Sequence, residues 1–104
     1  MAMTPEKKVK NAVVAVLKDA GAYYFYPVTG GYGSSGVPDI VACYRGKFIG
    51  IECKAGNGKP TKLQEKNLDD IRTAGGWTLV INENNVAAVV DVLRLIDIGE
   101  NESP

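Results

Sequence analysis

The sequence predicts an α/β fold in which a mixed central sheet is flanked by helices. The first and last apolar-periodic segments are rich in Ala and Val, which suits helices packed closely onto a sheet. Residues 37–54 form two short apolar runs joined by Arg45-Gly46, the pattern of a β-hairpin. The connection from Lys54 to Trp77 is long enough for a crossover helix, so the sheet is expected to be mixed.

A helix is predicted to begin at Thr4-Pro5-Glu6 and to end at Gly21. Thr4 suits the N-cap, Pro5 the first helical position and Glu6 the first turn. The apolar stripe consists of Val9, Val13, Val16, Leu17 and Ala20. Glu6 is most simply explained by the helix dipole, and a role as an additional metal-site carboxylate stays open.

The aromatic content of residues 22–27 predicts a strand. Its tyrosines suit a core and an interface, with stacking on bases as the alternative. Residues 29–36, TGGYGSSG, lack the Gly-Lys-Ser/Thr ending of a phosphate-binding P-loop. Their small residues and amides still suit close approach of a sugar-phosphate backbone.

A two-residue loop at Arg45-Gly46 fixes which hairpin residues face each other. The register pairs Tyr44 with Lys47, Cys43 with Phe48 and, continuing the count, Asp39 with Glu52. Lys54 shares the face of Glu52, because strand side chains alternate. Opposed carboxylates repel, and a divalent cation would offset that repulsion. The alternative is a turn residue at Asp39 and a surface pair of Glu52 with Lys54.

Thr61 is expected to cap a second helix, with Gln64 as the partner in a capping box. That helix should turn Leu63, Leu68 and Ile71 inward and stop at Gly75-Gly76. Residues 77–81, WTLVI, predict a strand buried on both faces. Asn85 is expected to cap a last helix, whose inner side would carry Val86, Val89, Val90, Leu93 and Ile96. Residues 1–98 are predicted to form one domain, and residues 99–104 a polar, disordered tail.

The composition excludes several kinds of chemistry. The chain has no histidine, which removes Ser-His-Asp and Cys-His catalysis and histidine-based metal nucleases. Two cysteines that cannot oppose each other predict free thiols. The absence of a long apolar run or signal-peptide pattern predicts a soluble, cytoplasmic protein with no membrane partner. Net charge is zero, but residues 1–81 carry eleven Lys and Arg against seven Asp and Glu.

Pro38-Asp39 and Glu52-Cys53-Lys54 resemble the signature of the PD-(D/E)xK nucleases. The predicted element order is similar to the restriction-endonuclease-like αβββαβ core of that superfamily. Together with Gly36, the hairpin register and Gln64, the chain resembles the virus-type replication-repair nuclease family, VRR-NUC. The resemblance covers about residues 4–96, and the size is similar to stand-alone members from phages and bacteria. It implies a bacterial or phage-infected cell.

The resemblance implies a role for each matched residue. Asp39 and Glu52 would bind Mg²⁺ or Mn²⁺, with the backbone carbonyl of Cys53 as a further ligand. Lys54 would orient or activate the attacking water and stabilise charge on the phosphate. Gln64 would join the site, in competition with its capping role, and Glu6 matches a first-helix acid of related junction-resolving enzymes.

These features predict a metal-dependent DNA endonuclease with no small-molecule cofactor. The resemblance implies branched DNA such as a four-way junction or flap, and a homodimer that presents two active sites to it. The candidate DNA contacts are Lys59, Lys62, Lys66, Arg45, Ser34, Ser35, Lys7, Lys8 and Lys10. The rivals are a non-catalytic nucleic-acid-binding module on a nuclease fold, a structural protein with a buried ion network, and a sequence-specific restriction enzyme.

Overall fold

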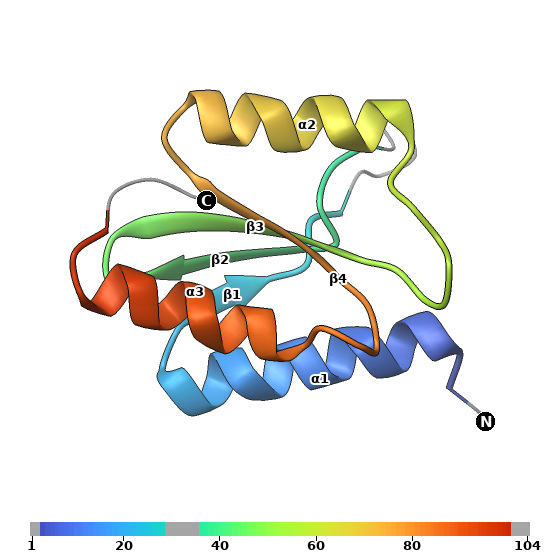
Figure 1. The fold of residues 1–104 in the computed structure, drawn as a ribbon, viewed down its shortest axis with the longest axis horizontal. Helices are drawn as coiled ribbons and strands as arrows, with labels where there is room; N and C mark the ends of the chain where they lie inside the picture. The colour runs from blue at the N-terminus through green and yellow to red at the C-terminus, as the bar shows by residue number, and fades with distance from the viewer. Residues whose placement is uncertain (1–2, 29–35, 101–104) are drawn as a thin grey trace.

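In the part of the chain that the structure describes, four strands form one sheet with helices on both faces (Figure 1). The computed structural model describes residues 3–28 and 36–100. The elements are α1 (Pro5–Ala20), β1 (Tyr23–Phe25), β2 (Ile40–Tyr44), β3 (Lys47–Cys53), α2 (Lys62–Thr73), β4 (Trp77–Ile81) and α3 (Ala87–Asp97). This order of elements is the predicted one.

The sheet has the strand order β1-β2-β3-β4, which places the hairpin strands in its middle. β1 pairs with β2 and β2 with β3 in the antiparallel sense, whereas β3 and β4 are parallel. The predicted mixed sheet is therefore confirmed. The predicted hairpin register is confirmed as well, with Cys43 facing Phe48 and Tyr44 facing Lys47.

Helix α2 covers one face of the sheet, while α1 and α3 pack on the other (Figure 1). Alternation along β3 sends Ile49, Ile51 and Cys53 into the core shared with α1 and α3. Gly50 and Glu52 therefore point toward α2. The chain passes very close to α2 at Gly36, where a Cβ would lie 2.6 Å from the carbonyl oxygen of Leu63.

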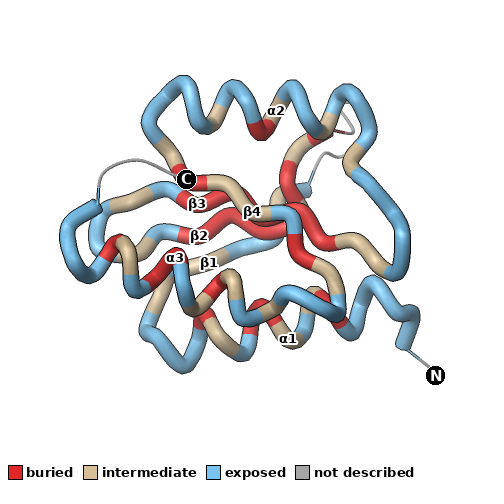
Figure 2. The backbone as a smooth tube through the Cα atoms, viewed as in Figure 1, coloured by how far each residue is buried: buried red, intermediate tan, exposed pale blue. Residues whose placement is uncertain are grey.

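The main core lies between the sheet and the pair of helices α1 and α3. Figure 2 shows the buried positions concentrated on the strands and on the inward sides of these two helices. Its members are aliphatic apart from Trp77 and Cys53, and include Val9, Val13, Leu17, Ile40, Ile49, Ile51, Ile81, Val89, Leu93 and Ile96. Burial of this apolar surface is the main favourable contribution to folding.

The predicted helix boundaries follow from capping residues. The Thr4 hydroxyl oxygen accepts a hydrogen bond from the Lys7 N–H at 3.1 Å, and Gly21 ends α1 in the left-handed conformation with φ +79°. Thr61 and Gln64 form the predicted capping box at the start of α2. No helix in the described residues is both long and apolar enough to cross a membrane.

Three predictions about side chains are wrong. β4 is not buried on both faces, since Val80, on the face that it shares with Glu52, is 38% exposed. Leu63 does not point inward and is 41% exposed. Asn85 does not cap α3, whose N-cap is Val86 without a side-chain hydrogen bond. Asn85 instead hydrogen-bonds within the turn that follows β4.

Candidate active site

Asp39 lies directly before β2, beside the end of β3. Since Ile40 pairs with Ile51, the next step of the antiparallel register brings Asp39 across from Glu52. Its carboxylate oxygen Oδ2 accepts a hydrogen bond from the Cys53 N–H at 2.7 Å. The preceding Pro38 is buried. The burial of Pro38 and this hydrogen bond therefore fix the Asp39 carboxylate in place.

Among the residues that the structure describes, Glu52 is the charged residue that is buried, and its exposed fraction is 1%. Its Oε1 accepts a hydrogen bond from Gln64 Nε2 at 3.2 Å. Its Oε2 is also buried, and within residues 3–28 and 36–100 it has no hydrogen-bond partner. A buried carboxylate oxygen without a partner is costly to the folded state, so this atom is a candidate ligand for a cation.

The electrostatics of the pair favour such a cation. Burial raises the pKa of Glu52 to about 8, with smaller upward contributions from the neighbouring Asp39. The ammonium of Lys54 acts in the opposite direction and lowers that pKa. The combined negative charge of two adjacent carboxylates is stabilised when a divalent cation neutralises it.

Gln64 caps α2 and also contacts Glu52. Its Oε1 accepts a hydrogen bond from the Thr61 N–H at 2.8 Å, which caps α2. Its Nε2 meanwhile donates to Glu52. The same side chain therefore ties the N-terminal end of α2 to the carboxylate pair.

Lys54 follows β3 and stays attached to β4 through its backbone. Its N–H donates to the Ile81 carbonyl oxygen at 2.9 Å. Among the described residues its ammonium forms no ion pair, although it lies near enough to Glu52 to lower the pKa of that carboxyl. The charge of Lys54 is therefore available to an anionic substrate beside the carboxylates.

Cys53 contributes its backbone to this site, and its side chain is buried in the core. The thiol is 0% exposed, and burial is the main reason that its pKa is raised to about 12. Cys43 is exposed, and both thiols are free as predicted. A neutral, enclosed thiol is a packing group, which leaves the Cys53 carbonyl as its only group suited to a metal.

Glu6 lies close enough to contribute to the raised pKa of Glu52, as the smallest of several causes. Within the described ranges, however, no three His, Cys, Asp or Glu side chains are grouped to hold one metal ion. The structure therefore brings Asp39 and Glu52 together and leaves Glu6 near, but outside, this pair.

The predicted DNA contacts fall on several surfaces. Lys59 and Lys62 lie just before and at the start of α2, and Lys7, Lys8 and Lys10 lie on α1. Lys10 Nζ lies over the Tyr26 ring, 5.4 Å from its centroid. Ser34 and Ser35 lie outside the described residues. These positions leave a basic segment near the start of each of the two helices that flank the carboxylates.

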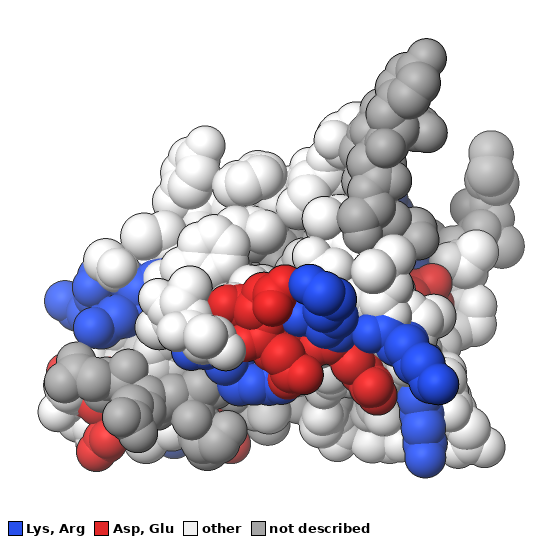
Figure 3. Space-filling model, turned by 90° about the horizontal axis from the view of Figure 1, so that it is seen from above, with Lys and Arg blue, Asp and Glu red and all other residues white. Residues whose placement is uncertain are grey.

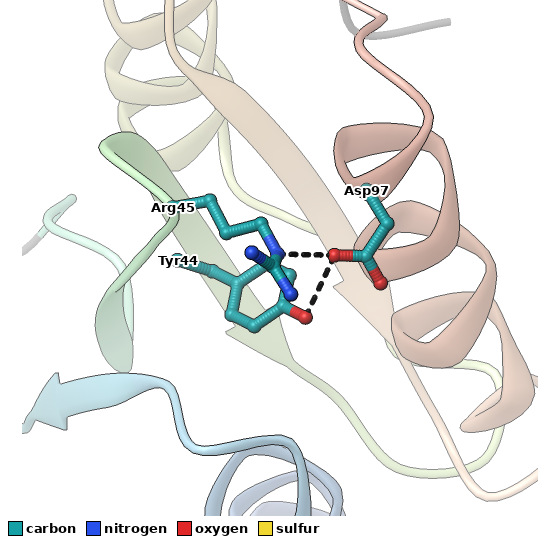
Figure 4. A network of polar contacts seen from close by, with 3 residues as sticks. All are labelled: Tyr44, Arg45 and Asp97. Carbon is teal, nitrogen blue, oxygen red and sulfur yellow. Dashed lines mark hydrogen bonds and ion pairs between the residues drawn. The ribbon is translucent and has the colours of Figure 1, made fainter.

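Two of the predicted contacts already have acidic partners. Lys66 Nζ pairs with Asp70 on the exposed side of α2 at 2.9 Å. Figure 3 shows acidic side chains gathered between basic ones on the surface seen from above. Arg45 pairs with Asp97 of α3 at the tip of the hairpin, where the Tyr44 hydroxyl also donates to Asp97 (Figure 4). The structure thus separates Arg45 from the carboxylate pair by the length of β3.

One contact beside the site was not predicted. Both carboxylate oxygens of Glu83 accept the Gly56 N–H, at 2.9 and 3.1 Å. Part of the signal was available, because Glu83 follows a strand that was predicted to belong to the same mixed sheet as the hairpin. Without knowing that β3 and β4 are parallel neighbours, however, nothing in the sequence joins residues 56 and 83.

Comparison with solved structures identifies the fold. A structure described as a VRR_NUC domain is similar over 94% of this chain and 100% of its own chain, with a TM-score of 0.68. The two sequences are 22% identical. The predicted α/β architecture is confirmed, and it is the fold of a nuclease domain.

Comparison of sequences gives the family. A family model described as archaeal Holliday junction resolvase (Hjc) matches residues 7–77, which is more than half of the chain. The chain therefore belongs to this nuclease family. A relative named "Putative nuclease p44", from Acyrthosiphon pisum secondary endosymbiont phage 1, is 28% identical over 95 residues. That match covers 90% of this chain and 100% of the relative.

Proposed function

We propose that this nuclease is a metal-dependent DNA endonuclease that cuts branched DNA as a homodimer. The observation that carries the metal-dependent chemistry is the buried Oε2 of Glu52, which has no partner among the described residues and faces the same site as Asp39. The preference for branched DNA is supported by the family, whose model is named for Holliday junction resolvases.

The side chains fit Mg²⁺ or Mn²⁺. Both ions prefer oxygen ligands, and Asp39 and Glu52 offer adjacent carboxylates beside the backbone of Cys53. Asp39 and Glu52 would hold the ion, with the Cys53 carbonyl as a further ligand. When bound there, a divalent cation would neutralise charge at phosphorus and lower the pKa of the attacking water.

The remaining roles belong to the chain itself. Lys54 would donate to a phosphate oxygen or to the attacking water, because its ammonium has no acidic partner among the described residues. Gln64 would fix the orientation of Glu52 through the hydrogen bond from Nε2 to Oε1. Glu6 would act from a greater distance, by adding negative charge that favours cation binding.

Phosphate contacts are proposed for the basic residues near the starts of α1 and α2. They comprise Lys59, Lys62, Lys7, Lys8 and Lys10. Each phosphate that they neutralise would steepen the fall of DNA affinity with salt. A flat salt dependence would contradict this assignment.

The homodimer would let two sites act on a two-fold symmetric junction. Sedimentation at micromolar concentration is expected to show a dimer. A protein that stays monomeric there would defeat the two-site model without affecting the proposed chemistry.

A cleavage assay tests the proposal as a whole. Labelled four-way junction, flap, linear duplex and single strand would be incubated with Mg²⁺, Mn²⁺, Ca²⁺ or EDTA. We expect junction cleavage with Mg²⁺ or Mn²⁺, and a loss of roughly 100- to 1,000-fold in rate in Lys54→Ala, as for removal of one charge-stabilising donor.

The other outcomes separate the rivals. Equal cutting of every substrate would retain the endonuclease and reject the preference for branched DNA. Tight, metal-independent binding without any cutting would favour the non-catalytic binding module.

A further inference from the structure

Backbone N–H groups of residues 54 and 56 form hydrogen bonds to β4 and to the turn that follows it. On one side, the Lys54 N–H donates to the Ile81 carbonyl oxygen at 2.9 Å. Two residues later, the Gly56 N–H donates to both carboxylate oxygens of Glu83. The segment that carries the Lys54 side chain is therefore held at both of its ends.

The turn after β4, which carries Glu83, is ordered by side-chain hydrogen bonds. The Asn82 N–H donates to Asn85 Oδ1 at 2.7 Å, and the Asn84 N–H donates to Asn82 Oδ1 at 2.8 Å. Asn85 Nδ2 donates to the Val80 carbonyl oxygen at 3.0 Å. These side-chain hydrogen bonds define the backbone of the turn on both sides of Glu83.

Gly56, which donates this hydrogen bond, has a conformation that suits glycine. Gly56 adopts the left-handed conformation, with φ +58°, which glycine reaches without steric cost. No heavy atom lies within 4 Å of the place where its Cβ would be, so the glycine serves conformation and not space. A carboxylate that accepts from a backbone N–H forms a charge-assisted hydrogen bond, which is stronger than a neutral one.

Parallel pairing explains why this contact forms at the site. Cys53 pairs with Ile81, so the chains leaving β3 and β4 emerge side by side at the same end of the sheet. This is also the end where Asp39 and Glu52 meet. A constraint on residue 56 therefore acts directly beside the carboxylate pair.

We propose that Glu83 is a positioning residue for Lys54. By holding Gly56 it fixes the path of residues 54–56, and thereby the direction in which the Lys54 ammonium leaves the sheet. The proposal rests on the proposed function only in giving Lys54 a role at the reacting phosphate. Glu83 itself touches neither the substrate nor the metal.

Activity gives the first test. Wild type, Glu83→Ala, Glu83→Gln and the matched control Asp91→Ala would be compared in single-turnover cleavage with saturating metal. Asp91 is an exposed acid on α3, so its removal changes the net charge equally. We expect Glu83→Ala to slow cleavage by roughly 10- to 100-fold through misplacement of Lys54, with unchanged affinity for DNA.

The conservative variant and a double mutant exclude a merely structural effect. Glu83→Gln keeps one acceptor oxygen and is expected to restore much of the rate. In a Lys54→Ala background, Glu83→Ala should cause no further loss, because it acts through Lys54. Equal rates for Glu83→Ala and Asp91→Ala, or full additivity with Lys54→Ala, would overturn the proposal.

A second measurement does not depend on cleavage. In ¹⁵N,¹³C-labelled protein, Glu83→Ala should speed exchange of the Gly56 amide and shift the side-chain resonances of Lys54, whereas Asp91→Ala should change neither. Unchanged Lys54 resonances in Glu83→Ala would reject the inference even if the wild type cuts no DNA. Shifted resonances without cleavage would support the inference while rejecting the proposed function.

Discussion

The β2–β3 hairpin carries a polar cluster at each end, and the two clusters differ in burial and in hydrogen bonding. At the tip, Arg45 and the Tyr44 hydroxyl both contact Asp97, and the side chains of Arg45 and Asp97 are 64% and 40% exposed. At the base, Glu52 is 1% exposed and retains a buried oxygen without a partner among the described residues. Asp39 lies beside it.

The tip cluster is explained by the fold alone. It joins the hairpin to α3 through an exposed ion pair, and such pairs contribute little to stability. The base cluster costs stability, because a carboxylate has been removed from water without full compensation. A cluster whose polar atoms all have partners is explained as a structural contact. A buried cluster with a polar atom that lacks a partner indicates a binding site for a ligand such as a cation.

The largest expected difference concerns cleavage. Asp39→Asn should lower the cleavage rate by more than the roughly 100-fold that follows loss of an outer partner of a metal site. Asp97→Asn makes the same chemical change at the other end of the hairpin and should leave the rate unchanged. Single-turnover kinetics on a junction substrate would measure both variants. Similar losses in the two variants would remove the distinction between the ends.

The next difference concerns metal binding. Mn²⁺ at one hundred times its dissociation constant should stabilise the wild type by about 2.7 kcal/mol, because it binds only the folded state. Asp97→Asn should keep this stabilisation, and Glu52→Gln should lose it. Thermal melting with and without Mn²⁺ would report it. An unchanged melting temperature in the wild type would favour a buried ion network without a metal.

The stability of the metal-free protein should depend on pH through Glu52. Its pKa is about 8 in the folded protein, above the ordinary value of 4.5, so the folded state binds this proton more tightly. The resulting stabilisation is fully present below pH 4.5 and is lost as the pH rises toward 8. Melting in EDTA should show this decline in the wild type and a flatter curve in Glu52→Gln. A decline of equal size in both proteins would assign it to other groups.

The smallest expected effect is at the tip. Tyr44→Phe removes the hydrogen bond to Asp97 and should destabilise the protein by less than about 1 kcal/mol. Cleavage should be unaffected, because Tyr44 lies at the far end of the strands from Glu52. Urea denaturation would measure the stability change. A large loss of activity in this variant would mean that the tip contacts the substrate.

Local rules predicted most of the fold. Thr4, Gly21 and the pair Thr61–Gln64 act within one or two helical turns, and Arg45-Gly46 sets the hairpin register, so each is specified by neighbouring residues. The partial exposure of β4 was missed because the WTLVI run has the composition of a strand buried on both faces. What covers a strand is decided by elements distant in sequence.

The site was predicted to a smaller extent. The register placed Asp39 beside Glu52, but the unsatisfied oxygen of Glu52 depends on how α2 packs over β3. Arg45 was grouped with the DNA contacts by its charge, and only the packing of α3 shows its partner Asp97. The contact of Glu83 with Gly56 likewise required knowledge of which strands are parallel neighbours.

The close passage of Gly36 beneath α2 has a consequence for which mutations this site tolerates. The Leu63 carbonyl oxygen, which would lie 2.6 Å from a Cβ at residue 36, belongs to backbone that cannot rotate aside. Leu63 directly precedes Gln64, the residue that holds Glu52. A methyl group at residue 36 would therefore clash with this turn of α2, so that either the segment at residue 36 or the turn that carries Gln64 would have to shift. The small size of glycine at residue 36 is therefore a condition for the packing of α2 beside Glu52.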